Sequence, residues 1–139
     1  MLVVVDTNIL LVSVSSRSKY HWLYELILDG RILIALTPGI LIEYEEQISK
    51  HWNSSIALDV VRSLTELSSS RFVTVYYNLE LITADPDDNK FVDCAFASNA
   101  DFIVSNDNHF AVLKNINFPS IPVLKIDAFN ELLKKENVI

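Results

Sequence analysis

The sequence predicts an α/β fold in which a central parallel sheet is covered by helices on both faces. Short apolar runs rich in β-branched residues alternate along the chain with segments whose apolar residues recur at helical spacing. The 139 residues are 50% hydrophobic, which is ample for one buried core, and they contain no repeat, low-complexity stretch or dividing linker. We therefore expect residues 1–139 to form a single three-layer α/β/α domain.

The first predicted elements are a strand and two short helices. Residues 2–5 are a continuous apolar run with three valines, which is typical of a buried parallel strand. Residues 8–14 and 20–28 have helical character and are separated by a polar loop. Gly30 suits the end of the second helix, because glycine readily adopts the left-handed conformation found there.

The next elements begin with a second predicted strand at residues 32–36. Thr37 can cap the following helix and Pro38 can occupy its first position, so this helix should run to about residue 50. Apolar residues at helical spacing then predict a further helix over residues 53–67. The pattern of strand followed by helix is thus repeated.

The second half of the chain is expected to contain three more strands, at residues 72–76, 102–105 and 123–126. An acidic turn around Pro86 leads into a helix over residues 88–98, whose acidic beginning complements the helix dipole. Asp127 is predicted to cap a last helix that ends at about residue 134.

Four acidic residues stand near the points where strands or loops give way to the next element. They are Asp6, Glu43, Asp88 and Asp107. The carboxyl ends of parallel strands lie at one edge of the sheet, where ligands of open α/β folds bind. Carboxylates that meet there repel one another and resist desolvation unless a hard divalent cation neutralises them. The sequence therefore predicts a Mg²⁺ or Mn²⁺ site.

Charge and hydropathy narrow the function classes. The net charge of −7 argues against a broad basic surface that binds nucleic acid through many phosphate contacts. It argues less against a metal-dependent nuclease, because bound cations attract phosphate themselves. No apolar run approaches the roughly 18 residues of a membrane span, and no signal segment is evident. We expect a soluble, cytoplasmic protein.

The remaining polar residues are interpreted as structural. The single cysteine, Cys94, lies in an apolar run and should be a small buried side chain. Solvent-facing, turn or packing roles are expected for the other acids, histidines and cations considered, which are Asp85, Asp87, His21, His51, His109, Arg17, Lys19 and Lys90. None of the histidines has metal-ligand spacing to another.

Several short motifs, in this order, resemble the PIN-domain nucleases, a family that includes the VapC-type toxins of bacterial toxin–antitoxin pairs. The matching pieces are Val-Asp-Thr-Asn at residues 5–8, Glu43 in the helix after the second strand, Asp88 at the start of a helix, and Ile-Val-Ser-Asn-Asp at residues 103–107. The run Asp-Pro-Asp-Asp-Asn-Lys-Phe at residues 85–91 looks most like one subgroup of toxin components. The resemblance covers essentially the whole chain.

The resemblance implies a Mg²⁺- or Mn²⁺-dependent endoribonuclease in which water is the attacking group. Asp6, Asp88 and Asp107 would be the main metal ligands, and Glu43 would bind directly or through water. Supporting residues would orient these ligands or water, and the candidates are Asn8, Ser105 and Asp93. Asp93 is ambiguous, because on an ideal helix it would point about 140° away from Asp88.

The same resemblance implies partners, and the residues leave two other functions open. A homodimer and an antitoxin protein are expected alongside the RNA substrate. A Mg²⁺-dependent phosphatase that forms an aspartyl phosphate would also place an aspartate after the first strand, but it usually needs a second one where this chain has Asn8. A catalytically silent interaction domain is the third possibility. With only Gly30 and Gly39, the chain cannot form a glycine-rich dinucleotide or phosphate loop.

Overall fold

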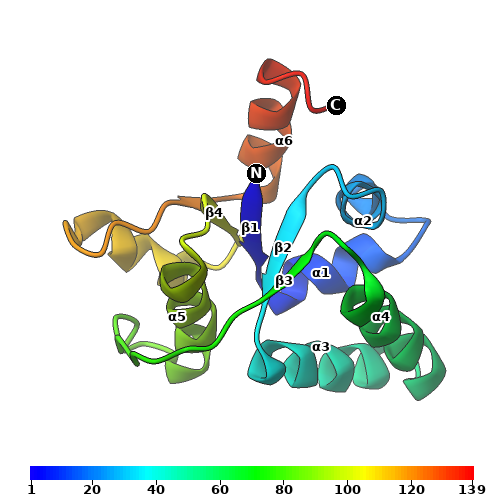
Figure 1. Cartoon of the computed structure of the whole chain (residues 1–139), viewed down its shortest axis with the longest axis horizontal. Helices are drawn as coiled ribbons and strands as arrows, with labels where there is room; N and C mark the ends of the chain where they lie inside the picture. The colour runs from blue at the N-terminus through cyan, green and yellow to red at the C-terminus, as the bar shows by residue number, and fades with distance from the viewer.

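The computed structural model describes residues 1–139 and contains one five-stranded sheet in the order β3-β2-β1-β4-β5 (Figure 1). All neighbouring strands are parallel. The strands are β1 (Leu2–Val5), β2 (Leu33–Leu36), β3 (Ser70–Phe72), β4 (Phe102–Val104) and β5 (Val123–Leu124). Because β1 pairs with β2 on one side and β4 on the other, the strand order reverses at β1. The carboxyl ends of β1 and β4 therefore flank the position where ligands bind in open α/β sheets.

Six α-helices and two short 3₁₀ helices connect the strands. They are α1 (Thr7–Val14), α2 (His21–Leu28), α3 (Pro38–His51), α4 (Ser54–Glu66), η1 (Pro86–Asp88), α5 (Asn89–Ser98), η2 (Asn108–Asn115) and α6 (Ile126–Lys135). Helix α5 packs on β1, β2 and β4 from one face, and α1 lies behind β2 on the other (Figure 1). The predicted three-layer α/β/α class is confirmed. None of these helices is both long and apolar enough to span a bilayer.

The core is one continuous cluster of 32 buried apolar residues. The three valines of β1 are completely buried, as their unbroken apolar run predicts for a strand covered on both faces. Cys94 is buried and free, which confirms its predicted packing role. Tyr44 of α3 is also fully buried, and its hydroxyl donates a 2.5 Å hydrogen bond to the carbonyl oxygen of Val5. This bond joins α3 to the carboxyl end of β1.

Two predicted helix boundaries are confirmed by their caps. The Thr37 hydroxyl accepts a hydrogen bond from the Ile40 amide at 3.2 Å, and Pro38 occupies the first turn of α3. Gly30 follows α2 with a φ of 73°, in the left-handed region that glycine tolerates best. Thr37 and Pro38 set the starting point of α3, and with it the position of Glu43, five residues after Pro38.

Two other predictions are wrong in detail. The strand expected over residues 72–76 is instead β3, Ser70–Phe72, because β2 ends at Leu36 and offers no backbone partner beyond that point. The last helix is not capped by Asp127, which lies in its first turn. The helix is capped instead by a side chain from a distant loop, because Asn106 Oδ1 accepts a hydrogen bond from the Ile126 amide at 3.0 Å.

Candidate metal centre

Asp6 lies directly beyond β1 and is held there by contacts to β4 and the residue that follows it. Its amide donates to the Val104 carbonyl at 3.1 Å, which continues the sheet pairing. Its carboxylate is buried, and Oδ2 accepts a 2.7 Å hydrogen bond from the Ser105 hydroxyl. The Ser105 oxygen in turn accepts the Asp107 amide at 3.0 Å. One hydroxyl thus connects the two aspartates at the ends of β1 and β4.

Asp88 reaches the same edge of the sheet from η1 and is only 8% exposed. His109 lies between it and Asp107, since Nδ1 is 3.3 Å from Asp88 Oδ2 and 3.4 Å from Asp107 Oδ1. The His109 amide also donates to Asp107 Oδ1 at 2.9 Å. Ser105 and His109 thus connect Asp6, Asp107 and Asp88 by a chain of contacts, but the carboxylates of these three aspartates do not all lie within 4.8 Å of one another.

The structure adds Asp85 and His109 to the acidic residues found from the sequence. One ligand atom each from Asp85, Asp88 and His109 lies within 4.8 Å of the others, a spacing that could hold a metal ion. From the sequence alone, Asp85 is expected in a turn and His109 in a solvated or packed position. The position of His109, two residues after a predicted ligand, was the available signal.

Glu43 extends from α3 toward the same region, and both of its oxygens have partners. Oε2 accepts a hydrogen bond from the Thr7 hydroxyl. Oε1 is 2.5 Å from Nζ of Lys90, a residue of α5 for which a solvent-facing role was expected. The three aspartates have no lysine or arginine partner, so Lys90 neutralises one of the four predicted ligands and leaves the others unpaired by such cations.

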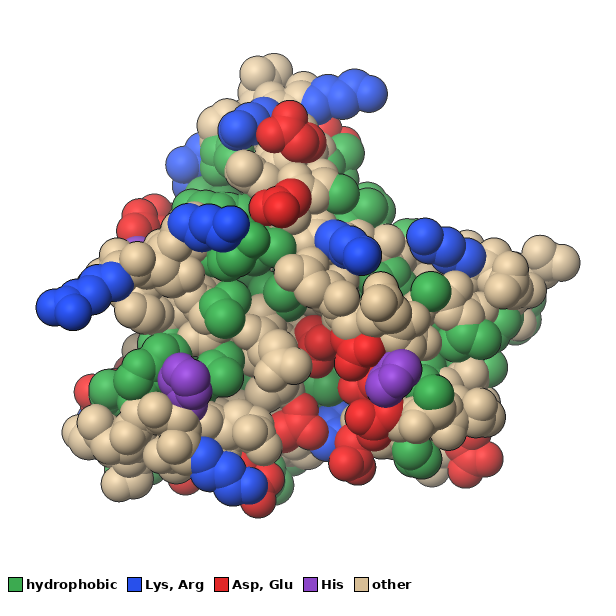
Figure 2. Space-filling view, turned by 180° about the vertical axis from the view of Figure 1, so that it is seen from behind, with side chains coloured by type: hydrophobic (Ala, Val, Ile, Leu, Met, Phe, Trp, Pro, Cys, Tyr) green, Lys and Arg blue, Asp and Glu red, His purple; other side chains and the backbone are tan.

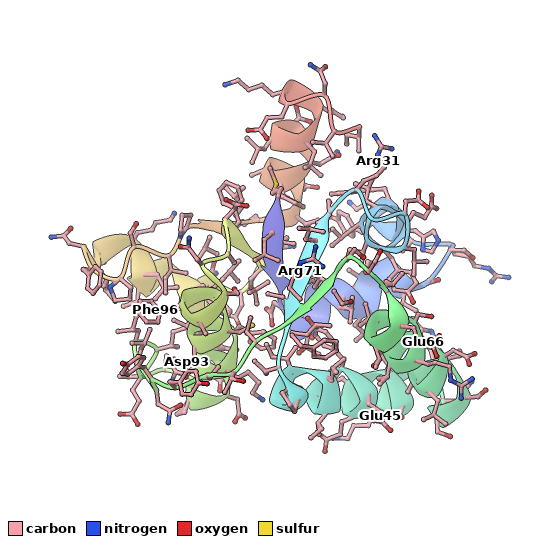
Figure 3. All side chains as sticks on the ribbon, viewed as in Figure 1. Arg31, Glu45, Glu66, Arg71, Asp93 and Phe96 are labelled. Atoms are coloured by element: carbon pink, nitrogen blue, oxygen red, sulfur yellow. The ribbon has the colours of Figure 1, made fainter.

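The two other predicted supporting residues lie in different places. Asn8 is exposed and, with Asp6 and Asp107, lines a cavity of about 300 Å³. Asp93 points instead to the segment before η1, where its Oδ1 accepts the Leu79 amide at 3.0 Å. Figure 3 shows Asp93 on the side of α5 that faces this segment. It is not in contact with the three aspartates, and its supporting role stays a prediction.

Electrostatic repulsion and burial both act on the aspartates. Burial is the main cause that raises the pKa of Asp6; the Ser105 hydrogen bond and the Thr7 amide oppose it, and the charges of Asp107 and Glu43 add to it. Burial also raises the pKa of Asp88 to about 6, reinforced by the charges of Asp107, Asp6 and Asp85. Figure 2 shows a group of acidic side chains on one face of the molecule, with a histidine beside it. This is a concentration of negative charge that protonation or a cation would relieve.

The donor set fits a divalent cation of the magnesium and manganese kind. Carboxylate oxygens are the ligands that Mg²⁺ and Mn²⁺ prefer. Asp6, Asp88 and Asp107 supply such oxygens along one edge of the sheet, and burial together with neighbouring carboxylates raises the pKa values of Asp6 and Asp88. The His109 nitrogen adds a donor better suited to transition metals than to Mg²⁺.

Comparison with known proteins identifies the class to which this fold and this acidic site belong. The family model of the PIN domain matches residues 2–109, a range that contains Asp6, Glu43, Asp88 and Asp107. The chain therefore belongs to the PIN-domain family, a family of nucleases, and the predicted family is confirmed.

A solved structure has the same fold. The chain is similar to a chain in the crystal structure of VapBC2 from Rickettsia felis bound to a DNA fragment from their promoter, with a TM-score of 0.61 and 21% sequence identity. The similarity covers 90% of this chain and 98% of that one. No match is found among curated proteins. At 21% identity this similarity shows that the two chains share a fold, in agreement with the parallel sheet and its helical layers.

Proposed function

We propose that residues 1–139 act as one PIN-like nuclease domain that cleaves RNA phosphodiester bonds internally and depends on Mg²⁺ or Mn²⁺. The observation that supports the proposal is that Asp6 and Asp107 follow the adjacent strands β1 and β4, where the strand order reverses, and that His109 lies between Asp107 and Asp88; the pKa values of Asp6 and Asp88 are raised. None of these three aspartates has a lysine or arginine partner, so a bound cation would compensate charge that the chain itself does not neutralise.

In this proposal Asp6, Asp88 and Asp107 hold the cation and Glu43 joins them directly or through water. A bound divalent cation would lower the pKa of water and stabilise negative charge on the phosphate and the leaving oxygen. Ser105 holds the Asp6 carboxylate by its 2.7 Å hydrogen bond and so limits the orientations available to it. His109 Nδ1 lies 3.3 Å from Asp88 Oδ2 and 3.4 Å from Asp107 Oδ1, where an N–H at Nδ1 would donate to one of these carboxylates and hold it in place.

We further propose that the protein is a cytoplasmic toxin and that an antitoxin is its partner. The similar Rickettsia structure is of a VapBC complex, which supports a partner of this kind. The unpaired carboxylates offer a place for basic side chains of the partner to bind, since charge-assisted hydrogen bonds to carboxylates are strong. A homodimer is proposed as well, with exposed apolar residues of α1 and α2, such as Val12 and Leu28, in the contact. Light scattering after size-exclusion chromatography tests it.

The nuclease proposal is tested with purified protein, an RNA panel and added Mn²⁺ or Mg²⁺. Cleavage should require the cation, and Asp6→Asn should abolish it without loss of the folded circular-dichroism spectrum. The exposed neighbour of the site, Asp87, supplies the matched control, and Asp87→Asn should retain cleavage. Cleavage that persists in chelator, or in Asp6→Asn, would contradict the mechanism.

The same assay separates the alternatives. A phosphomonoester substrate incubated in parallel should give no phosphate release, and no phosphorylated Asp6 should be trapped. Phosphate release through such an adduct would favour the phosphatase instead. Absence of turnover with every substrate, together with binding to a protein partner, would favour the silent interaction domain.

A further inference from the structure

Lys90 is the lysine that makes an ion pair with an acid of the candidate metal centre. Its Nζ is 2.5 Å from Glu43 Oε1, and the two side chains are only 30% and 21% exposed. The other oxygen of Glu43 accepts the Thr7 hydroxyl. Both oxygens of this predicted ligand therefore already have a hydrogen-bond donor, so a cation that bound Glu43 directly would have to compete with one of them.

The cavities around Lys90 provide alternative positions for its ammonium group. Besides contacting Glu43, Lys90 lines two adjoining cavities of about 560 and 330 Å³ beside α5. The larger one carries the carboxylates of Glu80, Asp87 and Asp93, and Asp93 also lines the smaller one. A flexible lysine side chain could leave Glu43 and stay near negative charge without any change in the buried core.

We propose that Lys90 is an internal counter-ion that occupies Glu43 when no divalent cation is bound and is displaced when the cation binds. Lys90 would then be a positioning residue, since it acts on the centre through Glu43. The reason is electrostatic: a lysine ammonium and a divalent cation compete for the same carboxylate oxygen, and each repels the other. This inference rests on the proposed function, because it takes Glu43 to be a ligand of that centre.

The test measures Mn²⁺ binding to chelator-treated protein by isothermal titration calorimetry, without RNA. Lys90→Met keeps the apolar length of the side chain and removes its charge, so it should tighten Mn²⁺ binding about tenfold, as expected when one positive charge a few ångströms from a divalent cation is lost. Lys134→Met removes the same charge on α6, where the lysine contacts only Glu131, and should leave the affinity unchanged.

The dependence on Glu43 is tested in a second background. In Glu43→Gln the carboxylate for which Lys90 and the cation compete is absent. Adding Lys90→Met should therefore change Mn²⁺ affinity much less in this background than in the wild type. A lysine that only stabilised the fold would have the same effect in both backgrounds. Equal effects of Lys90→Met in the two backgrounds would overturn the inference.

The remaining outcomes are distinct. Unchanged or weaker Mn²⁺ binding by Lys90→Met would show that Lys90 does not compete and would overturn the inference, while the proposed nuclease would stand. Absence of Mn²⁺ binding by the wild type would remove the metal-dependent function itself. If Lys90→Met does not fold, the wild type is titrated with Mg²⁺ and followed by NMR at the lysine ammonium groups. The Lys90 signal should change on Mg²⁺ binding, and an unchanged signal at saturation would overturn the inference.

Discussion

Replacement of Asp88 with asparagine should stabilise the cation-free protein against unfolding at about pH 7.5, even though it removes a predicted metal ligand. In the folded protein, burial and the charges of Asp107, Asp6 and Asp85 disfavour the ionised form of Asp88 and raise its pKa from 3.8 to about 6. Asparagine has almost the same shape, can still accept a hydrogen bond from His109, and carries no charge. The substitution therefore removes the cost of burying a charge and the repulsion by the neighbouring carboxylates, and it keeps the packing.

The magnitude follows from the pKa. One pKa unit corresponds to about 1.4 kcal/mol, so the rise to about 6 sets an upper limit of about 3 kcal/mol on the destabilisation caused by the ionised Asp88. The neighbouring side chains of Asp107 and His109 are partly exposed, so solvent screens part of this cost, and we expect a gain of about 1–2 kcal/mol. For a chain of this length that corresponds to an increase in Tm of about 3–8 °C.

The pH dependence has a definite sign. Between the unfolded pKa of 3.8 and the folded pKa of about 6, the folded state holds more protons than the unfolded state, so the free energy of unfolding falls as pH rises through this range. The destabilisation is complete above the folded pKa and disappears below the unfolded one. The advantage of Asp88→Asn should thus shrink to about a third of its full value at about pH 4.5.

Urea unfolding in the presence of chelator, at about pH 7.5 and about pH 4.5, measures these differences. Asp87→Asn changes the formal charge equally at an exposed neighbouring position and should alter stability by less than about 0.5 kcal/mol. The reasoning is refuted if Asp88→Asn is no more stable than the wild type at the higher pH, or if its advantage is the same at both pH values.

Two further predictions concern the cation and the attachment of α3. Mn²⁺ at about 100 times its Kd should stabilise the wild type by about 2.7 kcal/mol, because the cation binds the folded state and not the unfolded one. In a thermal-shift titration, Asp107→Asn should lose most of this stabilisation. An equal shift in both proteins would count against Asp107 as a ligand. Tyr44→Phe should lower the free energy of unfolding in urea by about 1–3 kcal/mol, because the buried Val5 carbonyl loses its hydrogen bond; no change would show that another donor replaces the hydroxyl.

Much of the fold was predictable because its signals are local. Three consecutive valines in residues 2–5 can be accommodated in a strand buried on both faces, and Thr37 with Pro38 specifies where the next helix begins. The rule that the carboxyl ends of parallel strands share one edge then places Asp6 near Asp107. The contact through Ser105 follows, since the serine occupies the first position after β4 and its hydroxyl faces Asp6.

The features that were not predicted depend on how distant elements pack. Lys90 and Glu43 are 47 residues apart, and their ion pair exists only because the first turn of α5 faces α3. His109 reaches Asp88 from η2, a 3₁₀ segment whose apolar residues do not recur at α-helical spacing, so the sequence pattern does not predict this helix. The end of β3 at Phe72 was equally hidden, because it is determined by the length of its partner strand rather than by the apolar residues of its own sequence.

Burial positions the carboxylates of Asp6 and Asp88 and also raises their pKa values, and this connects the site to the proposed antitoxin. Asp6 lies against fully buried strands, so its carboxylate is well oriented but has a raised pKa. Any positive group that binds there gains from relieving the repulsion, whether it is a divalent cation, a basic side chain of an antitoxin or, at Glu43, Lys90 of the chain itself. We therefore expect antitoxin binding and Mn²⁺ binding to oppose each other. A partner that inserted a basic residue among the three aspartates would weaken Mn²⁺ binding, and Mn²⁺ would weaken binding of the partner by the same factor.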